Sequence, residues 1–420
     1  MTQNFGIGPS GVRGAERVCA IRQFPGRLFG AGSPTARARR TASGSRLALI
    51  LLLLGSLVGC PPGKEADEDP TSARGFSRSH RDADGNFICR DPCDLFQIAW
   101  SGDNMIGDHG KAVLKRKGLD YPIGKVKVLL EDAFAVGNAE GPITKHRKKF
   151  NKKQMWSYGT KPEVAGVFAA AGFDAMGLAN NHAFDRGEIG LQDTLTHLHK
   201  AGIQTFGAGM DREQAEAPLL IETPHGTVGV VAMFRTGVVG QESGPSRPGT
   251  AWLNESTMRR AHERARAAGA RWVVAYVHWG RNYQTVRRQQ RQLARQLVHE
   301  GYDLVVGHGS HTPQKVELVD GVPVLYSLGN FTFTSYGRFR KLNVPQLGYG
   351  LVARTFLGPE GFEGIELRCL KTDNSVVKYQ PTLCGVEETQ ALFARLGDRL
   401  IIRGDAAVLS LSRPAAAEKP

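Results

Sequence analysis

The stretch at residues 177–182 constrains the fold of this chain most, because it places Asn181 and His182 at the end of a predicted strand. Residues 173–176 form a short apolar segment after a helical pattern at 162–171, and residues 188–201 carry apolar side chains at the spacing of one buried helix face. The pair therefore falls where a parallel strand ends and a helix begins, which is where open α/β sheets bind ligands. An amide oxygen and an imidazole nitrogen there can ligate a divalent metal. The alternative is that Asn180 and Asn181 only build the turn.

Other apolar segments end in polar residues of the same kinds. Segments 95–100, 133–137, 272–277 and 304–306 are followed by Asp103, Glu140, His278, and His308 with His311. Because parallel strands point their carboxyl ends to one edge of a sheet, we expect these side chains to converge. Carboxylates and imidazoles are the donors of two-metal hydrolytic sites. For any single histidine a packed core position is the simpler interpretation, but four at strand ends, His182 included, favour metal binding or catalysis.

The rest of the chain fits one α/β domain with appendages, since 420 residues with 41% hydrophobic content can bury a large core. Strands and helices alternate over residues 95–340. Residues 341–405 are predicted to add C-terminal strands to an outer sheet. Residues 406–420 are predicted to be a poorly ordered tail.

Residues 1–60 have the features of a bacterial export signal. They hold eight Arg and one Glu, which is +7 of the formal net charge of +14, and end in an apolar run at 47–58 that is too short to span a bilayer comfortably. The run leads into Leu57-Val58-Gly59-Cys60, which resembles the lipoprotein box in which the cysteine is lipidated. We therefore expect a lipid anchor on Cys60 and a place in the cell envelope, on its exterior or periplasmic side. A plain signal peptide or an uncleaved anchor is the alternative.

Residues 61–94 are polar and are predicted to form a flexible tether. Four cysteines remain beyond Cys60, and in an exported chain they suggest disulfides. The simplest pairs are Cys89 with Cys93 and Cys369 with Cys384, although other pairings stay open.

A dense group of cations follows Glu140. It comprises Lys145, Arg147, Lys148, Lys149, Lys152 and Lys153. Such a loop beside a site could hold a polyanion, with Lys148 and Lys149 as candidates, or it could be a solvated loop. Nucleic acid is not an expected partner, since an exported protein rarely meets it.

Taken together, these motifs resemble the CapA family of bacterial poly-γ-glutamate capsule proteins. Eight motifs carry the resemblance in order: 102–107, 138–144, 171–174, 178–182, 207–209, 277–280, 307–311 and 326–331. The resemblance covers roughly residues 96–333. It implies a metallophosphatase-like α/β/β/α sandwich with active-site loops at the strand ends.

The resemblance also implies a role for each residue at the strand ends. Metal ligation falls to Asp103, Asn181, His278, His308 and His311. His182 acts as a catalytic proton donor, and Glu140 as a ligand or base. Asn330, in the last motif, is assigned to substrate binding together with Lys148 and Lys149. The implied cofactor is a divalent metal (Mn, Fe or Zn), as one or two ions.

Two positions depart from the pattern. The wider superfamily has a histidine two residues after the first aspartate, where this chain has Met105, and many relatives carry a glutamate where it has Asn282. The sequence therefore leaves two hypotheses. One is an exported metallohydrolase-like protein that acts on an anionic surface polymer or its precursor. The other is a non-catalytic subunit that binds or anchors the polymer for a membrane synthase.

Overall fold

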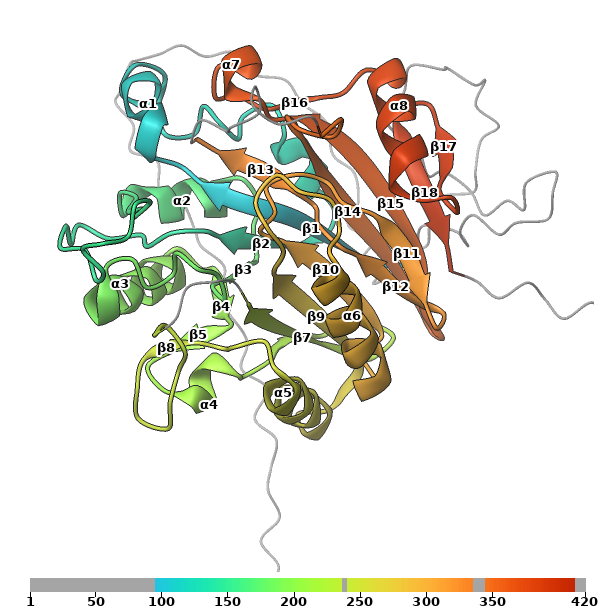
Figure 1. Cartoon of the computed structure of the whole chain (residues 1–420), viewed down its shortest axis with the longest axis horizontal. Coiled ribbons are helices and arrows are strands. Elements are labelled where there is room, and N and C mark those ends of the chain that lie inside the picture. The colour runs from blue at the N-terminus through green and yellow to red at the C-terminus, as the bar shows by residue number, and fades with distance from the viewer. Residues whose placement is uncertain (1–94, 236–239, 335–343, 412–420) are drawn as a thin grey trace, which may run out of the picture. The chain divides into compact units, whose positions relative to one another are not determined.

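Two stacked β-sheets with helices on their outer faces form the part of the chain that the structure describes (Figure 1). It is a computed structural model that describes residues 95–235, 240–334 and 344–411. The predicted export signal with Cys60, the tether, and the pair Cys89 and Cys93 lie outside these residues.

The first sheet has ten strands in the described residues, in the order β17-β18-β15-β14-β1-β2-β3-β4, with β13 paired to β1 and β16 to β15. β2, β3 and β4 continue from β1 in parallel, whereas β14 lies antiparallel to β1. The strands are β1 (Phe96–Met105), β2 (Phe134–Ala139), β3 (Ala175–Gly177), β4 (Gln204–Phe206), β13 (Asn330–Phe333), β14 (Tyr349–Gly358), β15 (Gly361–Lys371), β16 (Thr382–Leu383), β17 (Ile401–Arg403) and β18 (Ala406–Ser410).

The second sheet has six strands in the order β11-β12-β10-β9-β7-β6, of which β7, β9, β10 and β12 are parallel. The strands are β6 (Leu219–Ile221), β7 (Thr227–Phe234), β9 (Ala270–His278), β10 (Leu304–His308), β11 (Val316–Val319) and β12 (Val322–Leu325). The pairs β6–β7 and β11–β12 form antiparallel hairpins. A separate pair joins β5 (Ala208–Gly209) and β8 (Gly249–Thr250).

Eight α-helices lie in the described residues. They are α1 (Lys111–Lys117), α2 (Glu163–Ala170), α3 (Gly187–Lys200), α4 (Arg212–Ala215), α5 (Glu255–Ala267), α6 (Arg288–Glu300), α7 (Asn374–Val377) and α8 (Val386–Leu396), with 3-10 turns η2 (Asp108–Gly110) and η3 (Lys127–Leu130). Of these helices, α2, α3, α5 and α6 cover the outer faces of the sheets. α5 begins where the side chain of Asn254 accepts a hydrogen bond from the Thr257 amide. α6 buries Leu293 and Leu297, one turn apart, and ends at Gly301, which takes the left-handed conformation.

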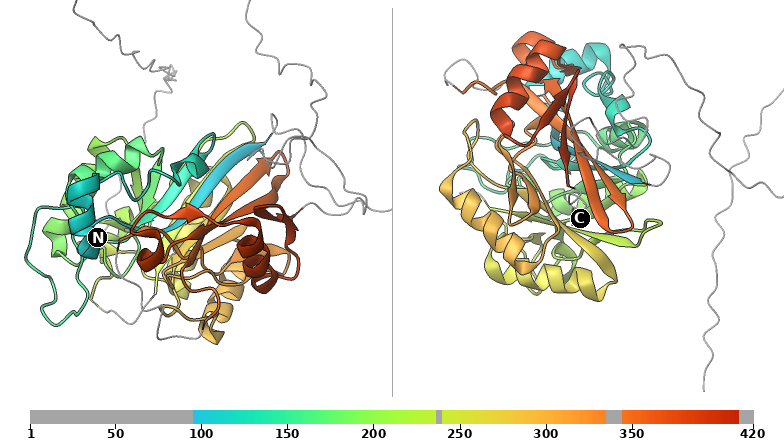
Figure 2. Two further views of the ribbon diagram at one scale, coloured as in Figure 1. Left: turned by 90° about the horizontal axis from the view of Figure 1, so that it is seen from above. Right: turned by 90° about the vertical axis from the view of Figure 1, so that its right-hand side faces the viewer.

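Three apolar layers hold the fold together. Ile98, Val136, Val230 and Val274 belong to the core between the two sheets. α2 and α3 pack on the outer face of the first sheet through a second core, and α5 and α6 pack on the outer face of the second sheet through a third (Figure 2). Burial of one face of each strand against each neighbouring layer stabilises this order. The layered α/β/β/α sandwich is therefore confirmed.

The prediction of a tail beginning at Ala406 is wrong for its first residues. Ala406–Ser410 forms β18, which pairs antiparallel with β15 and buries Ala407, Val408 and Leu409. A five-residue strand rich in alanine carries too weak a sequence pattern to be told from a tail. The strand is stable because long-range pairing supplies its hydrogen bonds.

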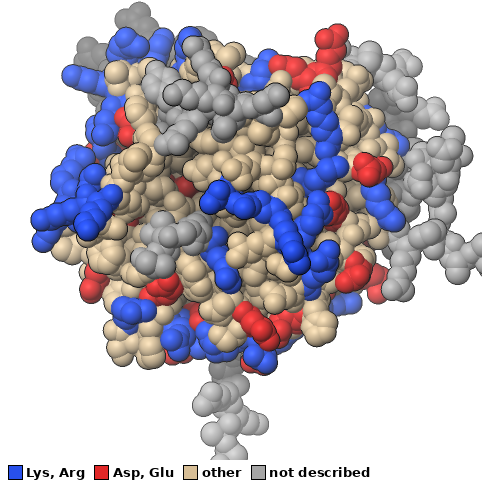
Figure 3. Space-filling model, viewed as in Figure 1, with Lys and Arg blue, Asp and Glu red and all other residues tan. Residues whose placement is uncertain are grey.

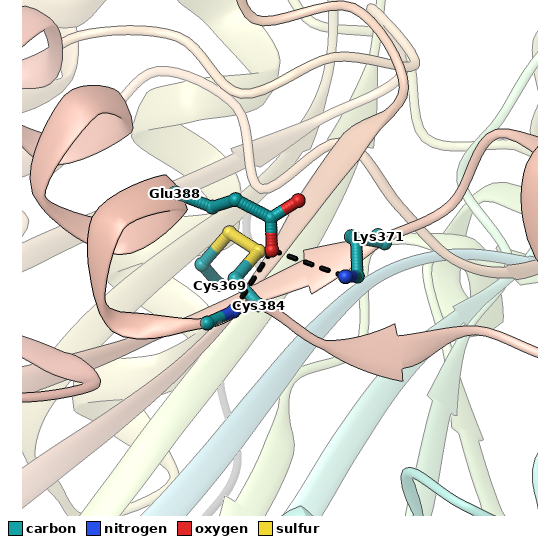
Figure 4. Close-up of a disulfide and its surroundings, with 5 residues drawn as sticks. Cys369, Lys371, Cys384 and Glu388 are labelled. Carbon is teal, nitrogen blue, oxygen red and sulfur yellow. Dashed lines mark hydrogen bonds and ion pairs between the residues drawn. A yellow bond between two sulfur atoms is a disulfide. The ribbon is translucent and has the colours of Figure 1, made fainter.

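The predicted pair Cys369–Cys384 is confirmed as a disulfide, with Cα atoms 5.4 Å apart (Figure 4). It joins β15 to the segment that leads into α8. An ion pair of 3.1 Å between Lys371 and Glu388 reinforces the same junction. None of the helices in residues 95–411 that the structure describes is long and apolar enough to cross a bilayer.

Candidate metal centre

The strand ends of both sheets bring two groups of metal-capable side chains together around Asp103. One group is Asp103, His278 and His308, and the other is Asp103, Glu140 and His311. In each group the candidate ligand atoms lie within 4.8 Å of one another, and every member is buried. β1 contributes Asp103 from the first sheet, and β9 and β10 contribute His278 and His308 from the second. These five residues therefore converge as predicted, but they come from strand ends of two sheets and not from one edge of a single sheet.

The first group has the spacing of ligands around one ion. The Nδ1 atoms of His278 and His308 are 3.1 Å apart, and they lie 3.8 and 3.3 Å from Oδ1 of Asp103. Ligands about 2.1 Å from a tetrahedral metal are separated by roughly 3.4 Å, which these distances bracket. The pairing of β9 with β10 explains the geometry, because His278 and His308 are register partners.

The second group places the other carboxylate beside His311. Nδ1 of His311 lies 3.1 Å from Oδ2 of Asp103 and 2.9 Å from Oδ1 of Asn330. Its Nε2 lies 3.6 Å from Oε1 of Glu140. When Nδ1 carries the proton and donates it to Asn330, Nε2 keeps the lone pair that a metal needs. Asn330 is itself buried, so the structure shows it as the partner of His311, and its predicted contact with substrate stays a prediction.

The loop that carries the last two histidines has an unusual backbone. His311 has a φ of 55°, a left-handed conformation that costs free energy in a residue with a side chain. Gly309 has a φ of 94°, and a Cβ added there would lie 2.7 Å from Nε2 of His278. The glycine is therefore required for the loop to lie against the His278 ring.

Burial and neighbouring charge separate the pKa values of the two carboxylates. Burial alone would raise the pKa of Asp103, but hydrogen bonds from His308 and His311 outweigh it and hold the pKa well below its usual range. The pKa of Glu140 is raised well above its usual range, first by burial and then by the charge of Asp103. Burial lowers the pKa of His278 and of His308, so both imidazoles are neutral at neutral pH, as metal ligation requires.

His182 stands at the rim of this group. Its Nδ1 lies 2.8 Å from Oδ2 of Asp185, and its Nε2 lies 4.0 Å from Oε1 of Glu140. The ring of Tyr158 packs on it with centroids 4.2 Å apart. Asp185 thus holds the proton on Nδ1 and fixes the ring so that Nε2 faces the carboxylate of Glu140.

Three residues of the site were missed by sequence reasoning. Asn138 donates a hydrogen bond of 2.9 Å to Oδ1 of Asp103, and Asn180 donates one of 2.9 Å to the side chain of Asn138. Asp185 orients His182. All three fall inside or beside the motifs that pointed to the site, and that position was the one available signal. Asn180 had been interpreted as a turn residue, and Asn138 and Asp185 had received no role.

The remaining predicted positions have different surroundings. The Oδ1 atom of Asn181 is buried and has no hydrogen-bond partner among the described residues, which suits a ligand. Met105, which stands where the superfamily has a histidine, packs with Tyr158 and Phe333. Asn282 is exposed.

The donor set fits a divalent metal. Both carboxylate oxygens of Glu140 are buried, and neither has a hydrogen-bond partner in the described part of the chain. Buried polar atoms without partners are costly unless a water or an ion satisfies them. Carboxylate, imidazole and amide donors suit Mn, Fe or Zn. Asp103, His278, His308, Glu140 and His311 would hold the ion or ions, with Asn181 beside them.

The layered sandwich and this donor set define an α/β protein with a candidate metal centre at the strand ends. The model of a family described as bacterial capsule synthesis protein PGA_cap matches residues 97–335, which is more than half of the chain. The chain therefore belongs to this family, and the resemblance to CapA proteins is confirmed.

Two relatives show the extent of the match. The chain is 28% identical over 247 residues to the PGA biosynthesis protein CapA of Bacillus subtilis strain 168, covering 57% of this chain and 64% of that protein. It is 30% identical over 243 residues to the capsule biosynthesis protein CapA of Bacillus anthracis, covering 55% and 58%. The chain thus spans about three fifths of the length of these relatives.

A solved structure, that of a hypothetical protein from Thermus thermophilus, aligns with 65% of this chain and 98% of its own. The identity is 14% and the TM-score is 0.42.

Proposed function

We propose that this protein acts in the synthesis of poly-γ-glutamate or a related anionic capsule polymer at the cell envelope, through a metal-dependent hydrolase-like site. The observation that supports this most is the pairing of two donor groups around Asp103 inside the segment that matches the family. The substrate would be the polymer or its precursor, and the partners would include subunits of a membrane synthase. Nucleic acid is not among the proposed partners.

The chemistry divides between a metal and the chain's own groups. When bound, a divalent metal would lower the pKa of a water molecule and offset negative charge on the substrate. His182, held through Nδ1 by Asp185, presents Nε2 as the proton donor to a leaving group. Glu140, whose pKa is raised by burial, would be either a ligand of the metal or, when ionised, a base for the attacking water. Lys148 and Lys149 are exposed and are proposed to attract the anionic polymer.

A second candidate function is the non-catalytic subunit that binds or anchors the polymer. The observation that favours it is the apolar packing of Met105, which leaves the first superfamily motif one ligand short. In this alternative the metal orders the cleft without turnover.

A test of the proposed function uses the host cell. Deletion of the gene should abolish surface poly-γ-glutamate, and the wild-type chain should restore it. A chain carrying His308→Ala should fail to restore it at equal protein abundance, whereas His299→Ala, an exposed histidine on α6, should restore it fully. Normal polymer in the deletion strain would contradict the proposed role. Full restoration by His308→Ala would contradict a role for the metal centre.

We also propose that Cys60 carries a lipid that holds the chain at the envelope. Cys60→Ala should release the protein from the membrane fraction or stop its processing, because the lipobox cysteine is the acceptor of the lipid. Fractionation with intact-mass measurement checks this. Unchanged membrane retention together with an unchanged mass would refute the lipoprotein assignment.

A further inference from the structure

The loop between β2 and α2 combines cations with exposed apolar side chains. Residues 145–156 hold the six Lys and Arg side chains described above and no Asp or Glu. In the same stretch Phe150, Met155 and Trp156 are 50%, 79% and 41% exposed. They are three of the eight large apolar side chains that the structure leaves exposed in the described residues, and they lie within seven positions. We name residues 145–156 the basic apolar loop.

Hydrogen bonds join the two ends of the basic apolar loop and fix the loop against Asp185. The Thr144 amide donates to the Thr160 carbonyl at 3.0 Å, which brings the two ends of the loop together. Beneath it, Asp185 accepts hydrogen bonds from the side chain of Gln154 at 2.7 Å and from the amide of Tyr158 at 2.6 Å. Its carbonyl also accepts from the amide of Phe150 at 3.0 Å. The loop is therefore fixed against the same aspartate that orients His182.

The positive charge of the loop does not explain why its apolar side chains are exposed. Phe150 packs edge-on against Phe184 with centroids 4.8 Å apart, and Trp156 lies with its ring 6.2 Å from that of His109, yet both remain substantially exposed. Lys and Arg side chains gather at the left edge of the molecule in Figure 3, where Figure 1 shows the loop between β2 and α2. A soluble polyanion would complement the cations but would gain nothing from Met155 or Trp156.

We propose that the basic apolar loop docks on the surface of an anionic lipid bilayer, so that the edge of the fold that carries the metal centre faces the membrane. Lys and Arg side chains are attracted to anionic headgroups, while aromatic and other apolar side chains enter the boundary between headgroups and acyl chains. Tryptophan is enriched at that depth because its ring has an apolar body and a polar N–H. The surface matches this occupant in both charge and apolar character. Docking needs neither the metal nor turnover, so the docking proposal can be tested independently of the proposed activity.

Tryptophan quenching tests the docking in the full-length chain. Vesicles of phosphatidylglycerol with brominated acyl chains should quench part of the protein fluorescence, and matching phosphatidylcholine vesicles should not. The chain has five tryptophans, of which Trp100, Trp272 and Trp279 are buried and Trp252 is half-buried against Phe234. Trp156→Phe should therefore abolish the quenching. The residues before 95 contain no tryptophan, so an anchor at the N-terminal end does not contribute to this signal.

Matched substitutions separate a bilayer from a polymer. Met155→Ser should weaken quenching by phosphatidylglycerol vesicles at least about fivefold, since an apolar side chain leaves the interface. It should leave binding to poly-γ-glutamate unchanged. Val376→Ser, at a position on α7 that is 67% exposed, should change neither. Replacement of Lys148, Lys149, Lys152 and Lys153 by Ser should weaken vesicle binding by more than about tenfold.

Several results would overturn the proposal. Equal quenching by both lipids, or quenching that survives Trp156→Phe, would show that the loop does not enter an anionic interface. Wild-type vesicle binding by Met155→Ser would exclude apolar insertion. Loss of polymer binding in the four-lysine variant, with no Trp156 quenching in the wild type, would assign the loop to the polymer instead.

Discussion

Replacement of His308 by alanine is expected to remove the bound divalent metal while the chain stays folded. His308 contributes to the donor group that also contains Asp103 and His278, and Nδ1 of His308 lies within 3.3 Å of the Asp103 carboxylate. Loss of one of three such donors should weaken metal binding by at least about 100-fold, because even the outer partners of metal ligands contribute about 10–100-fold. His278→Ala should have the same effect. Metal analysis of the purified protein, with circular dichroism as the test of folding, measures the result.

The matched control is His299→Ala, since His299 is exposed on α6 and belongs to neither donor group. It should keep the wild-type metal content. If the His308 and His278 variants both retain one or two equivalents of metal, the ion is held elsewhere and the site is wrongly assigned. If the wild-type protein binds no Mn, Fe or Zn, the metal centre itself is refuted.

The location of the site could be predicted from the sequence because strand topology fixes it. Asp103, Glu140, His278 and His308 each follow an apolar segment, and the carboxyl ends of parallel strands from both sheets meet at the site. The two-sheet sandwich is implied by the ordered motifs that resemble the CapA family and not by strand periodicity. These features depend on local pattern, which one sequence contains.

Other features depend on pairing across the chain and could not be predicted. The register of β9 with β10 sets His278 opposite His308, and no local pattern specifies a register. Asn138 meets Asp103, and Gln154 meets Asp185, only after distant segments fold together. Strand β18 could not be predicted because its alanines show no strand pattern of their own. The strand forms because it pairs with β15. The apolar exposure within the basic apolar loop is likewise a property of the folded chain.

His182→Ala is expected to keep the metal and to lose turnover. The side chain belongs to neither donor group, and its Nδ1 is held at 2.8 Å by Asp185 while Nε2 faces Glu140. A positioned proton donor contributes about 10²–10⁴-fold to a rate. The metal-loaded variant should therefore hydrolyse a generic phosphodiester more slowly than the wild type by that factor, with unchanged metal content. Steady-state kinetics on matched metal-loaded samples measure the difference.

Two further variants serve as comparisons for the effect of His182→Ala on turnover. Asp185→Asn keeps His182 but removes the charge that orients it, so it should lower turnover by less than His182→Ala. His197→Ala, on α3 and outside the site, should leave turnover unchanged. Wild-type kinetics in His182→Ala would exclude the proton-donor role. Metal bound stoichiometrically by the wild type, without turnover of any ester or amide, would instead favour the anchoring subunit, because Met105 leaves the first motif short of a ligand that two-metal hydrolysis uses.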